Sequence, residues 1–217
     1  MSKIQLYSLA TPNGQKVSIA LEEMGLEYDA HTINIMEDDQ FTPEFIAINP
    51  NSKIPALVDP EGDSGKPLNI MESGAILLHL AEKTGKFLPK DPGARSRVLQ
   101  WLFFQVGGAG PMFGQFGHFY KYGKNNCDHP YPVERYAKET RRLLKVMDVQ
   151  LSKNAFIAGE ELSIADFSLA PWVDGLSRFY EANEILELDS FKNVDRWMKI
   201  LMARPGFIKG REICGFS

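Results

Sequence analysis

The strongest constraint on the fold is a change in the sequence pattern near residue 90, from runs with strand character to purely helical periodicity. Short runs with strand character occur only before it, at Ile4–Leu9, Tyr28–Ile35, Ile54–Val58 and Leu68–Met71. Residues 87–95 contain two prolines and a glycine, and beyond them only helical patterns remain. We therefore predict an α/β domain over 1–86 and an all-helical domain over 95–217, joined by a linker over 87–94.

The order of elements in the first domain predicts a small mixed sheet covered by helices. After the first strand, Val17, Ala20, Leu21 and Met24 fall on one helix face, and Gly25 follows where a helix commonly ends. Strand–helix–strand order implies a parallel pair with a right-handed crossover. A turn over 62–66 implies an antiparallel hairpin of the last two strands, and a helix over 73–84 follows it.

The second domain is expected to hold helices near 95–120, 131–153, 163–181 and 190–203. The glycines of the segment Gly107–Pro111 predict a kink or close packing within the first of these helices. The segment Leu162–Phe167 carries a capping box, with Ser163 at the N-cap and Asp166 three residues on, plus a hydrophobic staple. We interpret this device as structural and not catalytic.

The composition excludes several classes of function. The net charge of −4 offers no basic face for nucleic acid. The chain shows no signal peptide and no apolar run that could span a membrane. Its two cysteines, Cys127 and Cys214, have no metal-type spacing, so we expect reduced thiols, a cytoplasmic setting and no metal. Phosphate-loop, zinc-protease and serine-hydrolase motifs are absent as well.

Three short segments could hold parts of one ligand. Thr11-Pro12-Asn13-Gly14 lies between the first strand and the first helix, where unpaired backbone N–H groups favour an anion such as a thiolate. Thr11 adds a hydroxyl donor and Asn13 an amide donor. A simple turn and N-cap explains the same residues, and local evidence alone favours that simpler interpretation.

The second segment is Ser52-Lys53-Ile54-Pro55, at the start of a strand. A cis Ile54–Pro55 bond would present the Ile54 backbone to a peptide ligand in β fashion. An ordinary trans proline at a strand edge is the alternative that base rates favour. The third segment is Glu72-Ser73-Gly74, where Ser73 is a good N-cap for a ligand carboxylate and Glu72 could hold an ammonium group. Simple capping with a solvated Glu72 explains it equally well.

Taken together, the three segments indicate a single ligand more strongly than any one of them does by itself. That ligand would carry a carboxylate with an amine, a peptide backbone and a thiol, and glutathione has all three. The combined pattern, Thr11–Lys16 with Lys53–Leu57 and Glu72–Ile76, resembles the N-terminal domain of glutathione transferases. The Thr-Pro-Asn-Gly form resembles the nu class and the related fungal nitrogen-regulator proteins, and Gln100–Gln115, Glu134–Tyr136 and Ser163–Asp166 extend the resemblance over nearly the whole chain.

The resemblance implies a glutathione transferase fold, a thioredoxin-like domain followed by a helical domain, usually as a homodimer. It also implies glutathione as cosubstrate, in reduced or oxidised form, and no active-site cysteine. Thr11 and Asn13 match the thiol-site positions of the family. Five further residues match glutathione-holding positions of the family: Gln40, Lys53, Ile54, Glu72 and Ser73. Arg135, in the helical domain, matches a position that reaches bound glutathione disulfide.

The resemblance also implies a function, glutathione-dependent disulfide reduction with weak conjugating activity on a small disulfide or electrophile. One alternative is a transferase that conjugates glutathione to electrophiles with the same thiolate. Another is a non-catalytic glutathione-binding regulator. The fungal relatives of that kind carry a long Asn/Gln-rich extension, and because this sequence starts directly at its first strand we expect an enzyme. Tyr7, within that strand, is expected to pack and not to catalyse.

Overall fold

The computed structural model describes residues 3–62 and 65–216, which fall into two compact units. The first unit comprises residues 1–88 together with 203–217, and the second comprises 89–202. This division differs from the expected one at the C-terminus, because residues 203–217 belong to the same compact unit as the α/β segment. The expected turn over 62–66 lies partly outside the described residues.

The first unit contains the predicted four-stranded mixed sheet, in the order β2-β1-β3-β4. Strands β1 (Ile4–Ser8) and β2 (Tyr28–Thr32) pair in parallel, whereas β3 (Ala56–Asp59) is antiparallel to β1 and to β4 (Leu68–Met71). The strand over 28–35 ends earlier than expected, and β3 begins only after Pro55, which cannot donate to the ladder. The ring of Tyr7 stacks on His31 with centroids 4.6 Å apart, as expected for a packing residue.

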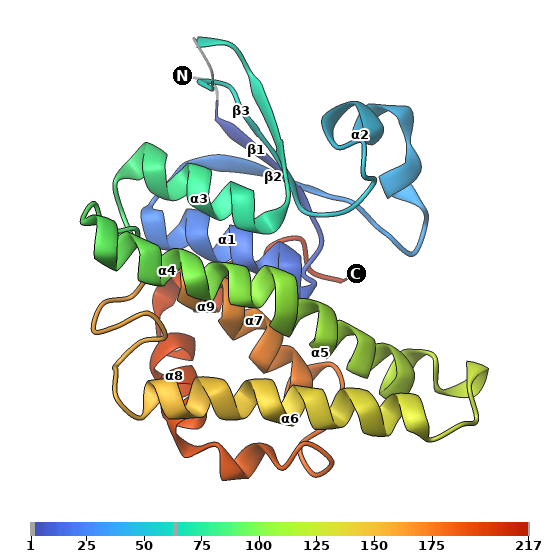
Figure 1. The fold of residues 1–217 in the computed structure, drawn as a ribbon. Helices are drawn as coiled ribbons and strands as arrows, with labels where there is room; N and C mark the ends of the chain where they lie inside the picture. The colour runs from blue at the N-terminus through green and yellow to red at the C-terminus, as the bar shows by residue number, and fades with distance from the viewer. Residues whose placement is uncertain (1–2, 63–64, 217) are drawn as a thin grey trace. The chain divides into compact units, whose positions relative to one another are not determined.

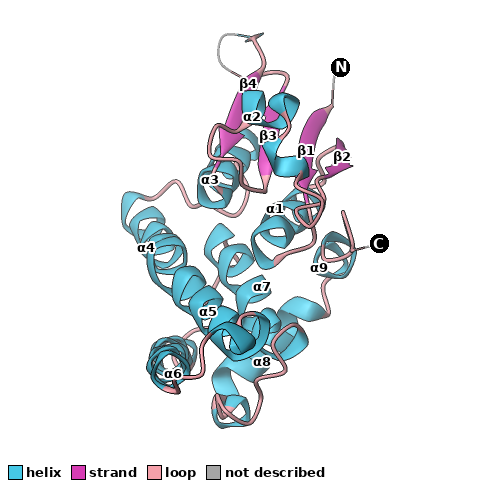
Figure 2. Ribbon diagram, turned by 90° about the vertical axis from the view of Figure 1, so that its right-hand side faces the viewer, coloured by secondary structure: helices cyan, strands magenta, loops and turns pink. Residues whose placement is uncertain are grey.

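Helices α1 (Pro12–Met24) and α3 (Ser73–Thr84) lie side by side against the sheet (Figures 1 and 2). Each ends at a glycine in the left-handed conformation, Gly25 at φ 71° and Gly85 at φ 67°. Between β2 and β3 the chain forms a short 3₁₀ turn, η1 (Asp39–Phe41), and α2 (Pro43–Ile48).

The C-terminal helix α9 (Pro205–Gly210) returns to pack on α1. The hydroxyl of Ser18 donates to the Gly210 carbonyl at 2.7 Å, and the Ala10 N–H donates to the Cys214 carbonyl at 2.8 Å. A Cβ on Gly210 would lie 2.6 Å from the Cα of Ile19, so only glycine allows this approach. Helix α9 is therefore part of the first unit's core.

The second unit is helical in the part of the chain described, as predicted. Its first helical stretch runs from α4 (Pro92–Phe104) through a π-helical turn, η3 (Gln105–Ala109), into α5 (Gly110–Gly117) and a second π-helical turn, η4 (His118–Tyr122). The predicted interruption at 107–111 is thus a π-helix. Close packing is confirmed only at Gly110, where a Cβ would lie 2.4 Å from Nε2 of Gln105.

The other helices of the second unit are α6 (Tyr131–Leu151), α7 (Ile164–Arg178) and α8 (Lys192–Met202). A short 3₁₀ turn precedes α6, η5 (Lys124–Asn126), and another precedes α8, η6 (Leu188–Ser190). The predicted capping box opens α7. Asp166 is fully buried, and its carboxylate accepts from the Ser163 backbone and hydroxyl, from the Ile157 N–H and from the indole of Trp197. None of the helices in the described residues has the length and apolar character of a membrane span.

Candidate functional site

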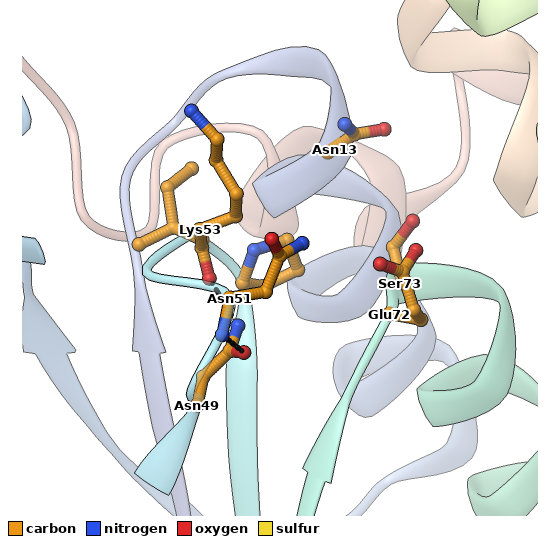
Figure 3. Close-up of a pocket in the computed structure, with 8 residues that line it drawn as sticks. Asn13, Asn49, Asn51, Lys53, Glu72 and Ser73 are labelled. Atoms are coloured by element: carbon orange, nitrogen blue, oxygen red, sulfur yellow. Dashed lines mark hydrogen bonds between the residues drawn. The ribbon is translucent and has the colours of Figure 1, made fainter. Parts of the chain in front are cut away.

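A polar pocket of about 180 Å³ lies within the first unit, at the ends of three segments that are distant in sequence. Figure 3 shows Glu72 and Ser73 on one side of it and Asn51 and Lys53 on the other, with Asn13 beside the start of α1. The pocket brings together five of the eight site residues expected from the sequence: Asn13, Lys53, Ile54, Glu72 and Ser73. Asn49, Asn51 and Pro55 complete its lining.

The first side of the pocket comes from the start of α1. Thr11 is the N-cap, and its hydroxyl accepts from the Gly14 N–H at 3.4 Å. Thr11 does not itself line the pocket but lies two residues before Asn13, which does. A Cβ on Gly14 would lie 1.9 Å from the Leu9 carbonyl oxygen, so glycine is required for this tight strand-to-helix turn. The turn thereby brings the positive end of the α1 dipole to the pocket.

The second side is the loop that ends in the Ile54–Pro55 bond, which is cis and not the trans form that base rates favour. Among the described residues, the Ile54 backbone has no hydrogen-bond partner. The amide of Asn49, 2 % exposed, fixes this loop by donating to the Lys53 carbonyl at 2.6 Å and accepting from the Asn51 N–H at 2.9 Å. Neither Asn49 nor Asn51 was among the site residues expected from the sequence. The signal was the Asn-Pro-Asn run itself, because Asn side chains commonly bond backbone groups two residues on.

The third side is the turn into α3, where the structure corrects one detail. We expected Ser73 to be the N-cap, but Glu72 holds that position with φ 68° and ψ 114°, and Ser73 is the first helical residue. A positive φ is unfavourable for a residue with a side chain and commonly marks a functional site. It places the exposed Glu72 carboxylate and the buried Ser73 hydroxyl together at the pocket.

Lys16 lies at this site although the sequence does not mark it as a site residue. Its side chain is 1 % exposed, and its ammonium donates to Oγ of Ser73 at 3.1 Å, so it lies directly behind the pocket wall. Burial lowers the pKa of Lys16 to about 7, and the nearby Glu72 carboxylate partly opposes this shift. Helical periodicity does not identify such a lysine, because residue type alone predicts a solvated side chain.

The structure does not place Gln40 or Arg135 at this pocket. Gln40 lies in η1, is 8 % exposed, and its amide nitrogen contacts Asp38 at 3.5 Å. Its amide oxygen is buried without a partner among the described residues. Arg135 lies in α6 of the second unit, half exposed, 3.9 Å from Glu139. The roles of both residues, and of Thr11 at the thiol, stay predictions.

Comparison with known proteins decides the family. The model of the glutathione S-transferase N-terminal domain matches residues 10–83, and that of the glutathione S-transferase C-terminal domain matches residues 132–205. The chain belongs to the glutathione S-transferase family. Its sheet order and helical second unit are the fold of that family, as the resemblance implied.

Similar members of the glutathione S-transferase family are known from bacteria. The chain is 46 % identical to the disulfide-bond oxidoreductase YghU of Escherichia coli over 97 % of this chain and 74 % of that protein. A glutathione transferase family member from Pseudomonas fluorescens, solved with two glutathiones bound, is 49 % identical, with a TM-score of 0.95 over 97 % of this chain and 93 % of the other. A glutathione transferase from Pseudomonas putida, solved with one glutathione disulfide per subunit, is 48 % identical, with a TM-score of 0.95 over 97 % and 91 %.

Proposed function

We propose that this chain is a glutathione-dependent disulfide-bond reductase of the nu-class type, with weak glutathione transferase activity. The observation that carries the proposal is that one pocket is lined by Asn13, Lys53, Ile54, Glu72 and Ser73, whose chemistry suits the separate parts of glutathione. Similarity to a disulfide-bond oxidoreductase and to structures that hold glutathione or its disulfide supports the same function.

Each wall of the pocket suits one part of the ligand. Glu72 supplies a carboxylate for the γ-glutamyl ammonium, and Ser73 with the first N–H groups of α3 suits the adjacent α-carboxylate. The Ile54 backbone suits the cysteinyl peptide unit in β fashion. Lys53 adds a positive charge for a further carboxylate, and Asn13 at the start of α1 suits the thiol end.

The reacting sulfur in this proposal belongs to glutathione. A thiol with a pKa of about 8.5 is mostly protonated at neutral pH, and hydrogen-bond donors and a helix N-terminus favour the thiolate. The thiolate attacks one sulfur of the substrate disulfide, forming a glutathione mixed disulfide and releasing a thiolate that takes up a proton. A second glutathione thiolate then attacks the mixed disulfide at the glutathione sulfur. Glutathione disulfide and the second substrate thiol are released.

The two cysteines are expected to be dispensable for this chemistry. Both are free thiols, and neither lines the pocket. The double variant Cys127→Ser, Cys214→Ser should therefore keep most of the glutathione-dependent reduction of a small model disulfide such as hydroxyethyl disulfide. The assay couples glutathione disulfide formation to NADPH oxidation by glutathione reductase. A folded double variant without activity would assign the attacking sulfur to the protein and refute the proposed mechanism.

Arg135 is proposed to favour the disulfide form of the ligand. Glutathione disulfide carries a second glutathionyl unit with its own carboxylates, and an arginine fork suits a carboxylate. Arg135→Ala should weaken binding of glutathione disulfide and leave reduced glutathione less affected. Calorimetric titration of both ligands measures the difference, with Arg142→Ala, also paired with Glu139, as the control. Equal effects on both ligands, or none, would leave Arg135 as a surface residue of α6.

The remaining expectations belong to this proposal as well. We propose a cytoplasmic setting, consistent with two free thiols, and a homodimer, as the family resemblance implies. Gln40 and Thr11 are proposed to contact glutathione from beside the pocket.

A further inference from the structure

Lys16 is a buried lysine that the proposed reaction leaves without a role. Its side chain is 1 % exposed on α1, and one of its contacts is the 3.1 Å hydrogen bond to the Ser73 hydroxyl. Burying an ammonium group is costly, and a chain that only needed to fill this space could do so with an apolar side chain. The position of the ammonium, directly behind a residue that lines the pocket, therefore calls for a functional explanation.

The hydrogen bond fixes the direction in which Ser73 donates. Because the charged ammonium of Lys16 has donors and no acceptor, Oγ of Ser73 accepts from Lys16 whenever Lys16 is charged. The hydroxyl proton of Ser73 is then directed elsewhere, and Ser73 lines the pocket. The Ser73 hydroxyl therefore suits a hydrogen-bond acceptor, and an anion best, because the positive charge of Lys16 lies immediately behind it.

We propose that Lys16 is a positioning residue of the glutathione site, which holds the Ser73 hydroxyl as a donor to the α-carboxylate of the γ-glutamyl group and supplies positive charge behind it. This inference rests on the proposed function. It adds that the protein takes up a proton when it binds the ligand. An anion beside Lys16 favours its charged form, so binding near neutral pH draws a proton from solution.

Burial makes Lys16 a group that titrates near neutral pH. Burial lowers its pKa to about 7, and Glu72 is the charged group that opposes the shift. Helix α1 packs against α3 and α9. The ionisable side chains of these helices include residues paired elsewhere: His79 and Lys83 with Asp59, Lys209 with Glu22, and Arg204, just before α9, with Glu23. Glu82 on α3, and Arg211 and Glu212 after α9, also belong to this set.

The sign of the pH dependence follows from these facts. Below the lowered pKa, Lys16 is charged before the ligand arrives and binding is strongest. As pH rises through about 7 and above, binding must also protonate Lys16, so affinity falls. Loss of one charge-assisted interaction corresponds to a roughly tenfold or larger loss of affinity.

The test is calorimetric titration with S-methylglutathione, which has no thiol to ionise. Wild-type protein is titrated near pH 7.5 in buffers of different ionisation enthalpy, which gives the number of protons taken up. Lys16→Met should bind roughly tenfold more weakly and take up fewer protons. Lys16→Gln, which keeps a donor for Ser73 without the charge, should lose the same proton uptake with a smaller loss of affinity. Lys86→Met is the matched control, because Lys86 donates to the Met24 carbonyl at the other end of α1.

Each outcome decides between the proposals. Wild-type protein that binds S-methylglutathione with no proton uptake overturns the role of Lys16, whatever the variants do. Folded Lys16 variants with wild-type affinity and proton uptake overturn it as well. Wild-type protein that does not bind S-methylglutathione at all refutes the proposed function instead. Reduced proton uptake in a Lys16 variant and unchanged uptake in Lys86→Met support the proposal.

Discussion

Replacement of Asp166 by alanine is expected to destabilise the helical unit by about 3–5 kcal/mol, because three buried N–H donors lose their acceptor at once. These donors are the backbones of Ile157 and Ser163 and the indole of Trp197, each 2.9 Å from the carboxylate. Asp166 is fully buried, so water cannot replace it without entering the core. A loss of this size lowers the midpoint of thermal unfolding by about 10 °C.

Tryptophan fluorescence measures this effect selectively. All three tryptophans of the chain, Trp101, Trp172 and Trp197, lie in the helical unit, so the fluorescence transition in urea reports on that unit. Asp195→Ala is the matched control. Its exposed pair with Lys199, 2.7 Å apart, should contribute less than about 1 kcal/mol. An Asp166→Ala protein as stable as this control would show that the capping box does not hold α7 and Trp197 in place.

Replacement of Glu72 by alanine is expected to weaken glutathione binding roughly ten- to hundredfold, the equivalent of about 1.5–3 kcal/mol. The ligand's γ-glutamyl ammonium loses a charged acceptor. Glu72 also occupies a backbone conformation at φ 68°, unfavourable for most residues, and this suggests that its side chain is retained for the ligand.

Glu72→Gln separates charge from shape, because it keeps the side-chain size and the backbone preference while removing the negative charge. It should lose most of the affinity that Glu72→Ala loses. Glu61→Gln serves as the control, since Glu61 is exposed and lies 3.9 Å from Lys83, away from the pocket. Calorimetric titration with reduced glutathione gives all three affinities. Unchanged binding in Glu72→Gln would remove the ion pair with the ligand ammonium from the site.

The features that sequence predicted best are those decided by neighbouring residues. The capping box at Ser163 and Asp166 depends on residues three apart, and the helix ends at Gly25 and Gly85 depend on a single residue type. The parallel pair of β1 with β2 and the antiparallel pair of β3 with β4 were predictable because short connections leave few topologies open, whereas the pairing of β1 with β3 was not predicted. The three pocket segments were predictable as a set, since each carries a local turn signal, and the carboxyl ends of β1 and β4 lie at the same end of the sheet as the start of the antiparallel β3.

The features that sequence did not predict depend on distant contacts. Whether Lys16 is buried depends on α3 packing against α1, and nothing within its own helix records that contact. The N-cap position of Glu72 follows from a positive φ that is set where β4 turns into α3, while residue preference pointed to Ser73. The role of Asn49 depends on the course of the loop back to Lys53. The π-helical turn over 105–109 was visible only as a glycine-rich interruption, and the one over 118–122 was not predicted.

The return of α9 makes the first unit discontinuous in sequence, so the helical unit is in effect an insertion between Leu88 and Ala203. A fragment that stops at residue 88 would lack the segment that covers Ile19 and accepts from Ser18, Gln15 and Ala10. The α/β half is therefore not a module that can be cut out at the linker and moved to another protein. A circular permutant that joins residue 217 to residue 1 and opens the chain near residue 88 would instead make this unit contiguous in sequence.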